Sequence, residues 1–322
     1  MKTMKWLVRR EFWEHKGMFF WAPIIAAGLI VLAVLAATFK GSTSIGTNRV
    51  EVNGHVVTTQ VNGLPQEAVE TVGTVLSATY LAAAGPLLLL MTFALFFYCL
   101  GALYDERRDR SILFWKSLPV SDSETVVSKV ASALVMVPLL YLGISIVMAI
   151  VSLLIGSLGL LAHGINIFPV LLSQPSLYTG PLMVIGLLPV YILWALPTVG
   201  WLLMVSSWAK SKVFLWAVGV PLMLLAVLNM LTIAFGLTWN LEWFSTNIVM
   251  RALASLVPGV WIGFADLDAQ AIVQVADKAP DFTGLFTQSW ATLAGPNVWI
   301  GAAAGVAMIA VAVRMRRYRD EG

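Results

Sequence analysis

Long apolar runs alternate with shorter polar segments along the whole of this 322-residue chain. A helix that crosses a membrane needs about 20 consecutive, mostly apolar residues. Runs of this length occupy six stretches: 19–39, 75–103, 128–157, 182–207, 213–236 and 294–313. Apart from Lys129 at the edge of the third run, they contain no Asp, Glu, Lys, Arg or His. The pattern predicts an all-α polytopic membrane protein with about six transmembrane helices.

Residues 1–18 come before the first run and have a helical pattern of their own. Four apolar side chains share one arc at helical spacing: Met4, Leu7, Val8 and Phe12. Basic side chains occupy the opposite arc, and Glu11 interrupts the apolar one. We expect an amphipathic helix on the inner membrane surface, with an ordinary positively charged anchor for the first span as the alternative.

The first outer segment, residues 40–74, contains a turn signal. Its stretch RVEVNGHVVTTQV alternates around Asn53-Gly54, a dipeptide that favours a tight hairpin because both positions tolerate positive φ. Pro65-Gln66-Glu67 is typical of a helix start and leads into the second span.

The large outer loop, residues 237–293, includes an apolar stretch that is interrupted by a charge. Residues 243–265 resemble a span, but Arg251 lies among them. A central arginine costs about 2.5–3.5 kcal/mol on membrane-insertion scales. We therefore predict a re-entrant or interfacial element here and no seventh span.

Two features modify the predicted spans. Pro181, Pro189 and Pro197 recur in the fourth, and each removes a backbone donor and favours a bend. In the sixth, Gly301 to Gly305 reads GAAAG, a seam of small residues that permits close approach of another helix.

Composition and charge support the membrane assignment and orient it. Hydrophobic residues make up 59% of the chain and charged residues 11%, with a mean hydropathy of +0.85, whereas soluble domains carry about 25% charged residues. Lysines and arginines gather in the segments on one side of the spans, and the exceptions among the 20 are Lys40, Arg49, Arg251 and Lys278. By the positive-inside rule, both termini face the cytosol. The net charge of +3 reflects this bias and does not indicate nucleic-acid binding.

Motifs for several kinds of chemistry are missing from the sequence. It contains no GxxxxGK[ST] phosphate-binding loop and no HExxH zinc motif, and its three histidines fall in separate segments. We predict no catalytic residue, metal ligand or bound cofactor in this chain. If the protein is a pump, we expect its energy to arrive from another polypeptide. Asn229 is the most polar side chain within a span, suited to an interhelical hydrogen bond and a weak candidate substrate contact.

The segment 104–129, between the second and third spans, combines charge with an apolar patch. It begins with Asp105 to Arg110 and continues with Ile112-Leu113-Phe114-Trp115. Leu118-Pro119 should interrupt any helix here, because proline disfavours helical conformation at the preceding residue. Ser121 and Glu124 have the spacing of a capping box that starts the next helix.

These residues resemble a recurring pattern of the ABC-2 type permeases, the membrane subunits of ATP-binding cassette exporters. The pattern is matched by four elements of this chain: Glu106-Arg107, Ser111-Ile112, Leu118-Pro119-Val120-Ser121 and Lys129. The chain departs from it at Arg110, where glycine is frequent, and at Phe114, where an acidic residue is frequent. The opening RREFWEHKG, Arg9 to Gly17, is similar to the family's N-terminal interfacial helix.

The resemblance implies a single ABC-2 transmembrane domain over residues 1–322, with a cytosolic coupling loop at 104–127. It implies a multi-pass protein of the cell membrane, by family the bacterial inner membrane. The expected partners are the lipid bilayer, two copies of a separate ATPase subunit that holds ATP and Mg, and a second permease that is identical or related. The residues expected to couple this chain to the ATPase are Glu106, Arg107, Arg108, Phe114, Trp115, Leu118 and Pro119.

The expected function is therefore export of a substrate, driven by ATP hydrolysis on the partner. Apolar, aromatic spans suit an amphipathic substrate such as a peptide, a drug or a lipid-like molecule. Two alternatives remain at this point: an accessory or sensor subunit without its own transport pathway, and a polytopic membrane enzyme.

Overall fold

The structure is a computed structural model that describes residues 2–45, 50–52, 55–57, 66–111, 120–162, 164–236, 239–264 and 282–318. Within these ranges it contains six helical segments that are long and apolar enough to cross a membrane: Gly17–Phe39, Tyr80–Arg108, Asp122–Ala162, Pro175–Trp208, Leu215–Phe235 and Pro296–Tyr318. Each coincides with one of the predicted runs. The prediction of an all-α polytopic membrane protein is confirmed.

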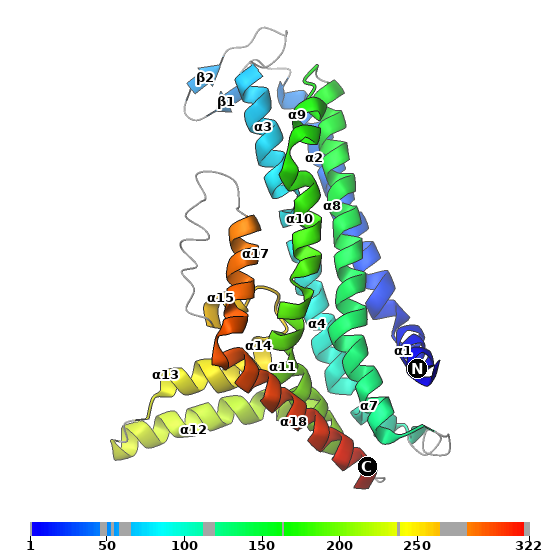
Figure 1. Cartoon of the computed structure of the whole chain (residues 1–322), viewed down its shortest axis with the longest axis vertical. Coiled ribbons are helices and arrows are strands. Elements are labelled where there is room, and N and C mark those ends of the chain that lie inside the picture. The colour runs from blue at the N-terminus through cyan, green and yellow to red at the C-terminus, as the bar shows by residue number, and fades with distance from the viewer. Residues whose placement is uncertain are drawn as a thin grey trace.

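The helices of the described residues carry the labels of Figure 1. Their bounds are α1 Lys2–Glu14, α2 Ala22–Ile45, α3 Gln66–Thr79, α4 Gly85–Gly101, α5 Tyr104–Arg108, α7 Asp122–Ala131, α8 Val137–Ala162, α9 Phe168–Ser173, α10 Pro175–Gly186, α11 Leu188–Trp208, α12 Val220–Phe235, α13 Leu241–Phe244, α14 Arg251–Ala254, α15 Trp261–Phe264, α17 Phe282–Ala291 and α18 Pro296–Tyr318. Wider π-helical turns join some of them: η1 Gly17–Trp21, η3 Ser132–Met136, η4 Leu215–Gly219 and η5 Ser245–Met250. Two turns are 3-10 helical, η2 Tyr80–Ala84 and η7 Thr292–Ala294.

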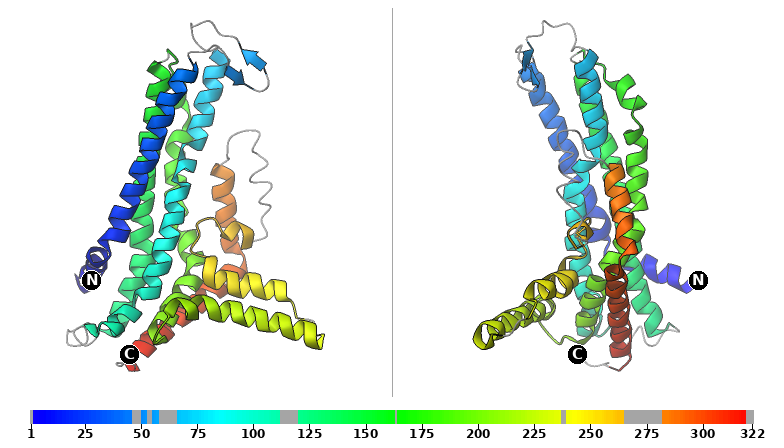
Figure 2. Two further views of the ribbon diagram at one scale, coloured as in Figure 1. Left: turned by 180° about the vertical axis from the view of Figure 1, so that it is seen from behind. Right: turned by 60° about the vertical axis from the view of Figure 1, so that its left-hand side comes forward.

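Most of the long helices run along the long axis of the molecule. Figure 1 shows α2, α3, α4, α8 and α10 in this direction, with the strands at one end and both termini toward the other. In Figure 2, α12 and α13 project sideways from this bundle as a pair. The N-terminal helix, the end of α18 and α7 therefore gather at the same end of the protein.

The short polar signals in the sequence predicted local structure well. The strands β1 (Val50–Val52) and β2 (His55–Val57) form an antiparallel hairpin in which Val52 pairs with His55. This confirms the hairpin expected around Asn53-Gly54, whose own two residues lie outside the described ranges. The helix start expected after Pro65 is confirmed by α3, which begins at Gln66.

The stretch 243–265 contains no helix long enough to cross a membrane within its described residues, as predicted. The elements α13, η5 and α14 run continuously from Leu241 to Ala254, α15 follows after a turn, and Arg251 at the start of α14 is buried. The guanidinium lies 4.8 Å from the centre of the Trp194 ring, and Nη1 donates a 2.8 Å hydrogen bond to the carbonyl oxygen of Asn297. Arg251 therefore ties this stretch to α11 and α18, and its placement relative to the lipid stays a prediction.

The small-residue seam of the sixth span packs against α11 of the same chain. A Cβ atom on Gly305 would lie 2.5 Å from the carbonyl oxygen of Leu196, and one on Gly200 would collide with the backbone of Gly305. Because both residues are glycine, the two backbones approach more closely than any side chain would allow. The α11–α18 pair is thus held in close contact.

The prolines of the fourth span divide it once. Helix α10 ends at Gly186 and α11 begins at Leu188, with Pro189 in its first turn. Pro181 and Pro197 lie inside α10 and α11. The bend expected in this span therefore occurs at Pro189, which has no N–H to continue the helix.

We predict that Gly305→Ala destabilises the protein while Gly143→Ala does not. The new methyl group at 305 meets backbone atoms that cannot move independently, and overpacking of this kind costs about 1–3 kcal/mol. At Gly143, on α8, a Cβ atom has nothing within 4 Å, and alanine is the better helix former. Thermal unfolding of the two variants in the same detergent measures the difference. Equal midpoints would contradict the close α11–α18 contact.

Candidate functional site

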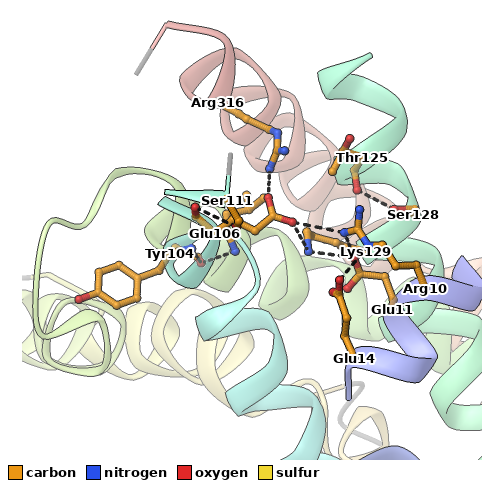
Figure 3. A network of polar contacts seen from close by, with 12 residues as sticks. Arg10, Glu11, Glu14, Tyr104, Glu106, Ser111, Thr125, Ser128, Lys129 and Arg316 are labelled. Carbon is orange, nitrogen blue, oxygen red and sulfur yellow. Dashed lines mark hydrogen bonds and ion pairs between the residues drawn. The ribbon is translucent and has the colours of Figure 1, made fainter. Parts of the chain in front are cut away.

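A cluster of charged side chains is buried at the end of the bundle where the termini lie. We call it the ionic cluster and define it by Arg10, Glu11, Glu106, Lys129 and Arg316. These residues come from α1, α5, α7 and α18, and Figure 3 shows them converging from these helices. Burial of ionised groups is costly unless each group is paired with another.

Lys129 is the centre of the ionic cluster. Its ammonium nitrogen lies 3.0 Å from Oε1 of Glu11 and 3.0 Å from Oε1 of Glu106. The side chain of Lys129 is 2% exposed and that of Glu11 0%. A single ammonium group therefore holds two carboxylates from different helices.

The two arginines extend the ionic cluster in opposite directions. Arg10 Nη2 lies 2.6 Å from Glu11 Oε1 and 3.4 Å from Glu106 Oε1. Arg316 forms a short ion pair with Oε2 of Glu106, and its Nε donates to Asp122 Oδ1 at 3.1 Å. Glu106 is thus ion-paired with basic side chains from three helices: α1, α7 and α18.

Tyr98 on α4 completes the environment of Glu11. Its hydroxyl donates to Glu11 Oε2 at 2.8 Å, and its ring packs edge-on against His15 and Phe19. Burial by itself raises the pKa of Glu11, but the positive charges of Lys129 and Arg10 and the Tyr98 hydrogen bond outweigh it and leave this pKa below its usual value. Glu11 is therefore ionised at neutral pH.

Glu14, at the edge of the ionic cluster, behaves in the opposite way. Burial raises the pKa of Glu14 above its usual value, although Arg10, 3.2 Å away, opposes the shift. Glu11, Glu14 and His15 also have ligand atoms close enough to hold a metal ion. Since both oxygens of Glu11 already accept hydrogen bonds from Arg10, Lys129 and Tyr98, we assign no metal there.

Arg107, next to Glu106, points to the other side of α5. It donates to the carbonyl oxygens of Ser206 at 2.6 Å and Ala209 at 2.9 Å, at the C-terminal end of α11. A cation is favourable there because the last carbonyls of a helix lack backbone partners. The hydroxyl of Ser206 in turn accepts from the backbone N–H groups of Leu103 and Tyr104.

The structure brings together some of the residues expected at the coupling loop. Glu106 and Arg107 are inward-facing anchors, whereas the side chain of Arg108 is 60% exposed and pairs with Asp105 and Asp109. Phe114, Trp115, Leu118 and Pro119 lie outside the described residues. Asn229 is exposed on α12, and its proposed roles stay predictions.

After residues 112–119, which lie outside the described ranges, the loop ends as the sequence predicted. The Ser121 hydroxyl accepts from the backbone N–H of Glu124 at 3.2 Å, and Glu124 Oε2 accepts from the backbone N–H of Ser121 at 3.1 Å. This confirms the capping box that starts α7. The cap fixes where the helix carrying Lys129 begins.

Sequence analysis alone did not identify Glu11, Lys129 and Arg316 as partners. Glu11 stood out as a charge within an apolar arc, and Lys129 as a charge at the edge of a span. Both signals point to burial of a charge, but neither indicates its partner. The apolar arc of α1 includes Leu7, which is buried, and α1 packs on α7.

Arg110 has a backbone conformation that suits glycine better than arginine. Its φ is 57°, in the left-handed region, and its side chain is exposed. For a residue with a Cβ atom this conformation costs roughly 1–2 kcal/mol, while glycine adopts it freely. The chain turns here directly after α5.

We predict that Lys129→Met lowers the free energy of unfolding by about 3–5 kcal/mol, because the carboxylates of Glu11 and Glu106 are left buried without their shared cation. Arg108→Met is the control, since exposed ion pairs contribute less than about 1 kcal/mol. Adding Glu11→Gln to Lys129→Met should recover part of the loss. Thermal unfolding followed by tryptophan fluorescence measures all three, and a wild-type midpoint for Lys129→Met would show that the pairing is unimportant.

We predict that Arg110→Gly stabilises the protein by about 1 kcal/mol, because it removes the strain of a left-handed residue. Arg108→Gly, at the end of α5, gives the same chemical change on ordinary helical backbone and should destabilise by about 0.5–1 kcal/mol. Chemical unfolding in detergent compares the two. A loss of stability in both variants would rule out strain at Arg110.

No protein-family model, curated protein or solved structure matches this chain. The function of the protein must therefore be inferred from its own residues.

Proposed function

We propose that this protein is the transmembrane subunit of an ATP-driven exporter and that residues 104–129 receive the force of a separate ATPase. One observation carries the proposal: Glu106 and Lys129, which stand at the two ends of this segment, are joined by a 3.0 Å ion pair. The ion pair therefore holds the two ends of the segment together. Because its ends cannot move apart, a push on the segment is passed to the helices that contact Glu106 and Lys129.

The contacts of Glu106, Lys129 and Arg107 determine which helices receive a push on the segment. Through Glu106 and Lys129 it reaches α1 and α18, by way of Arg10 and Arg316. Through Arg107 it reaches the end of α11. Two further membrane spans, α11 and α18, and the N-terminal helix are thus connected to one short segment, as coupling to an external motor requires.

The residues expected to face the ATPase lie in the same segment. Arg108 and Asp109 are exposed, and Glu124 at the start of α7 is partly exposed. We assign Phe114 and Trp115 as the aromatic anchors of the interface, since buried aromatics often dominate binding energy. We place the protein in the cell membrane. Because lysine and arginine gather at this end of the protein, this end and both termini would face the cytosol.

The assembly proposed is two permease chains, identical or related, with two ATPase subunits that hold ATP and Mg. Substrate export would follow from alternating closure of the two permeases toward each side of the membrane. The substrate class that suits apolar, aromatic spans is amphipathic. An accessory or sensor subunit would bind the same ATPase but support no transport when reconstituted.

We predict that a tagged wild-type chain, purified gently from its host, retains an ATPase subunit and that Trp115→Ala loses it. Truncation of an interface anchor typically weakens binding by tenfold or more. Trp243→Ala is the matched control, because Trp243 is 56% exposed on α13, outside the segment. Mass spectrometry of the eluate, with ATP hydrolysis of the captured complex, provides the readout.

Two results would contradict the proposal. One is the absence of any ATPase from a folded wild-type preparation under conditions that preserve a comparable exporter. The other is equal capture by Trp115→Ala and Trp243→Ala, which would place the interface elsewhere.

A further inference from the structure

A partly open apolar cavity of about 320 Å³ lies between the helices, away from the ionic cluster. Its walls come from η2, α4, α8, the junction of α10 and α11, α15 with the turn before it, and α17. Side chains such as Leu88, Met91, Leu142, Leu188 and Trp261 form most of its surface. Figure 1 shows α4, α8 and α10 running alongside one another in this part of the molecule.

Polar atoms in the wall are few, and two of the three are already occupied. Tyr191 donates its hydroxyl to the carbonyl oxygen of Leu256 at 3.3 Å, and Trp261 donates its indole N–H to Ser289 at 2.9 Å. The third is the hydroxyl of Ser145, whose residue is 2% exposed. Among the residues that the structure describes, this hydroxyl has no hydrogen-bond partner.

An unpaired buried hydroxyl is unfavourable, so a ligand that accepts a hydrogen bond from it removes that cost and binds more tightly. The described residues that line the cavity include no charged side chain. A carboxylate or ammonium group would therefore be desolvated here without a partner, which is far more costly than burial of a neutral polar group. The site is suited to a molecule with a hydrocarbon body and one uncharged acceptor.

The size of the cavity and the extent of its walls further limit which ligands can fit. An engineered protein cavity of about 150 Å³ holds benzene, so this one has room for roughly a dozen carbon atoms. Its wall on η2 and α4 runs from Leu81 to Met91, a length of about 15 Å along the helix. On α8 the wall runs from Pro138 to Ile146, which places Ser145 near one end. The lining residues therefore extend along the helices, with the unpaired hydroxyl of Ser145 toward one end.

We propose that this cavity binds an ester-linked acyl chain of a lipid, with the Ser145 hydroxyl donating to the ester carbonyl oxygen. A chain of about twelve methylene groups follows the length of the wall, and burial of each stabilises the complex. The site belongs to the single chain and needs neither the ATPase nor the ionic cluster. It holds whether or not the protein is an exporter.

The test uses the full chain in phosphatidylcholine vesicles that contain a trace of phosphatidylcholine with a photoactivatable diazirine in its acyl chain. After irradiation, adducts are mapped by peptide mass spectrometry. Met91 and Tyr191 are 2% and 4% exposed, so lipid that only surrounds the protein cannot reach them. Adducts on these two residues are the expected result, and adducts confined to outward-facing residues such as Phe93 and Phe97 would overturn the proposal.

Two tryptophan variants on the same helix control for occupancy. Leu142→Trp fills the cavity and should reduce adducts on Met91 and Tyr191 at least tenfold, while Leu154→Trp, at an exposed position of α8, should leave them within twofold of wild type. Equal labelling in both variants would overturn the proposal. Circular dichroism checks the fold of each.

Ser145→Ala tests the hydrogen bond in a variant that removes only one atom from the wall. Loss of one such bond should reduce labelling about fivefold, and unchanged labelling would remove Ser145 from the site. A diazirine fatty acid of equal chain length tests the source of the chain. Labelling of Met91 and Tyr191 by the ester probe in preference to the fatty acid supports the proposal, and the reverse order overturns it.

Discussion

The cost of burying an ionised group controls how the helices meet at the end of the bundle where the termini lie. An unpaired ammonium or carboxylate in such surroundings costs several kcal/mol, and Lys129 and Glu11 are almost wholly buried. Each charge of the ionic cluster is compensated by one from another helix. The ion pairs therefore favour one relative position of the four helices α1, α5, α7 and α18. In any other position, buried charges would lose their partners. The contact of Arg107 with the end of α11 extends the same constraint to the centre of the bundle.

Features that depend on neighbouring residues could be predicted from the sequence. The six spans follow from run length, the hairpin from Asn53-Gly54, and the start of α7 from the spacing of Ser121 and Glu124. In each case the determining interactions lie within a few residues, or depend only on apolarity averaged over about 20 residues. The small-residue seam of the sixth span was visible as well, although its partner Gly200 on α11 was not.

The candidate site could be predicted only in part, because its contacts join distant residues. Lys129 and Glu11 are 118 positions apart, and Arg316 and Glu106 are 210 apart. The pattern of a single sequence does not show which carboxylate pairs with which cation at such separations. Glu106 and Arg107 were singled out by pattern, but the opposite directions of their side chains depend on the packing of α5 between neighbouring helices. Ser145 gave no signal at all, since an isolated serine in a span is ordinary.

The third span has a mechanical property that follows from its continuity. Residues Asp122–Ala162 form one helical segment in which the π-helical turn η3 joins α7 to α8, and Lys129 lies near one end of it. The remaining length beyond Lys129 is about 50 Å at 1.5 Å per residue. The segment acts as a lever with its short arm in the ionic cluster, so a small tilt of α7 that is transmitted through η3 becomes a displacement of several ångströms at the other end. The apolar cavity lies along the same lever, at Pro138 to Ile146, where any tilt would change the width of the space between α8 and α4.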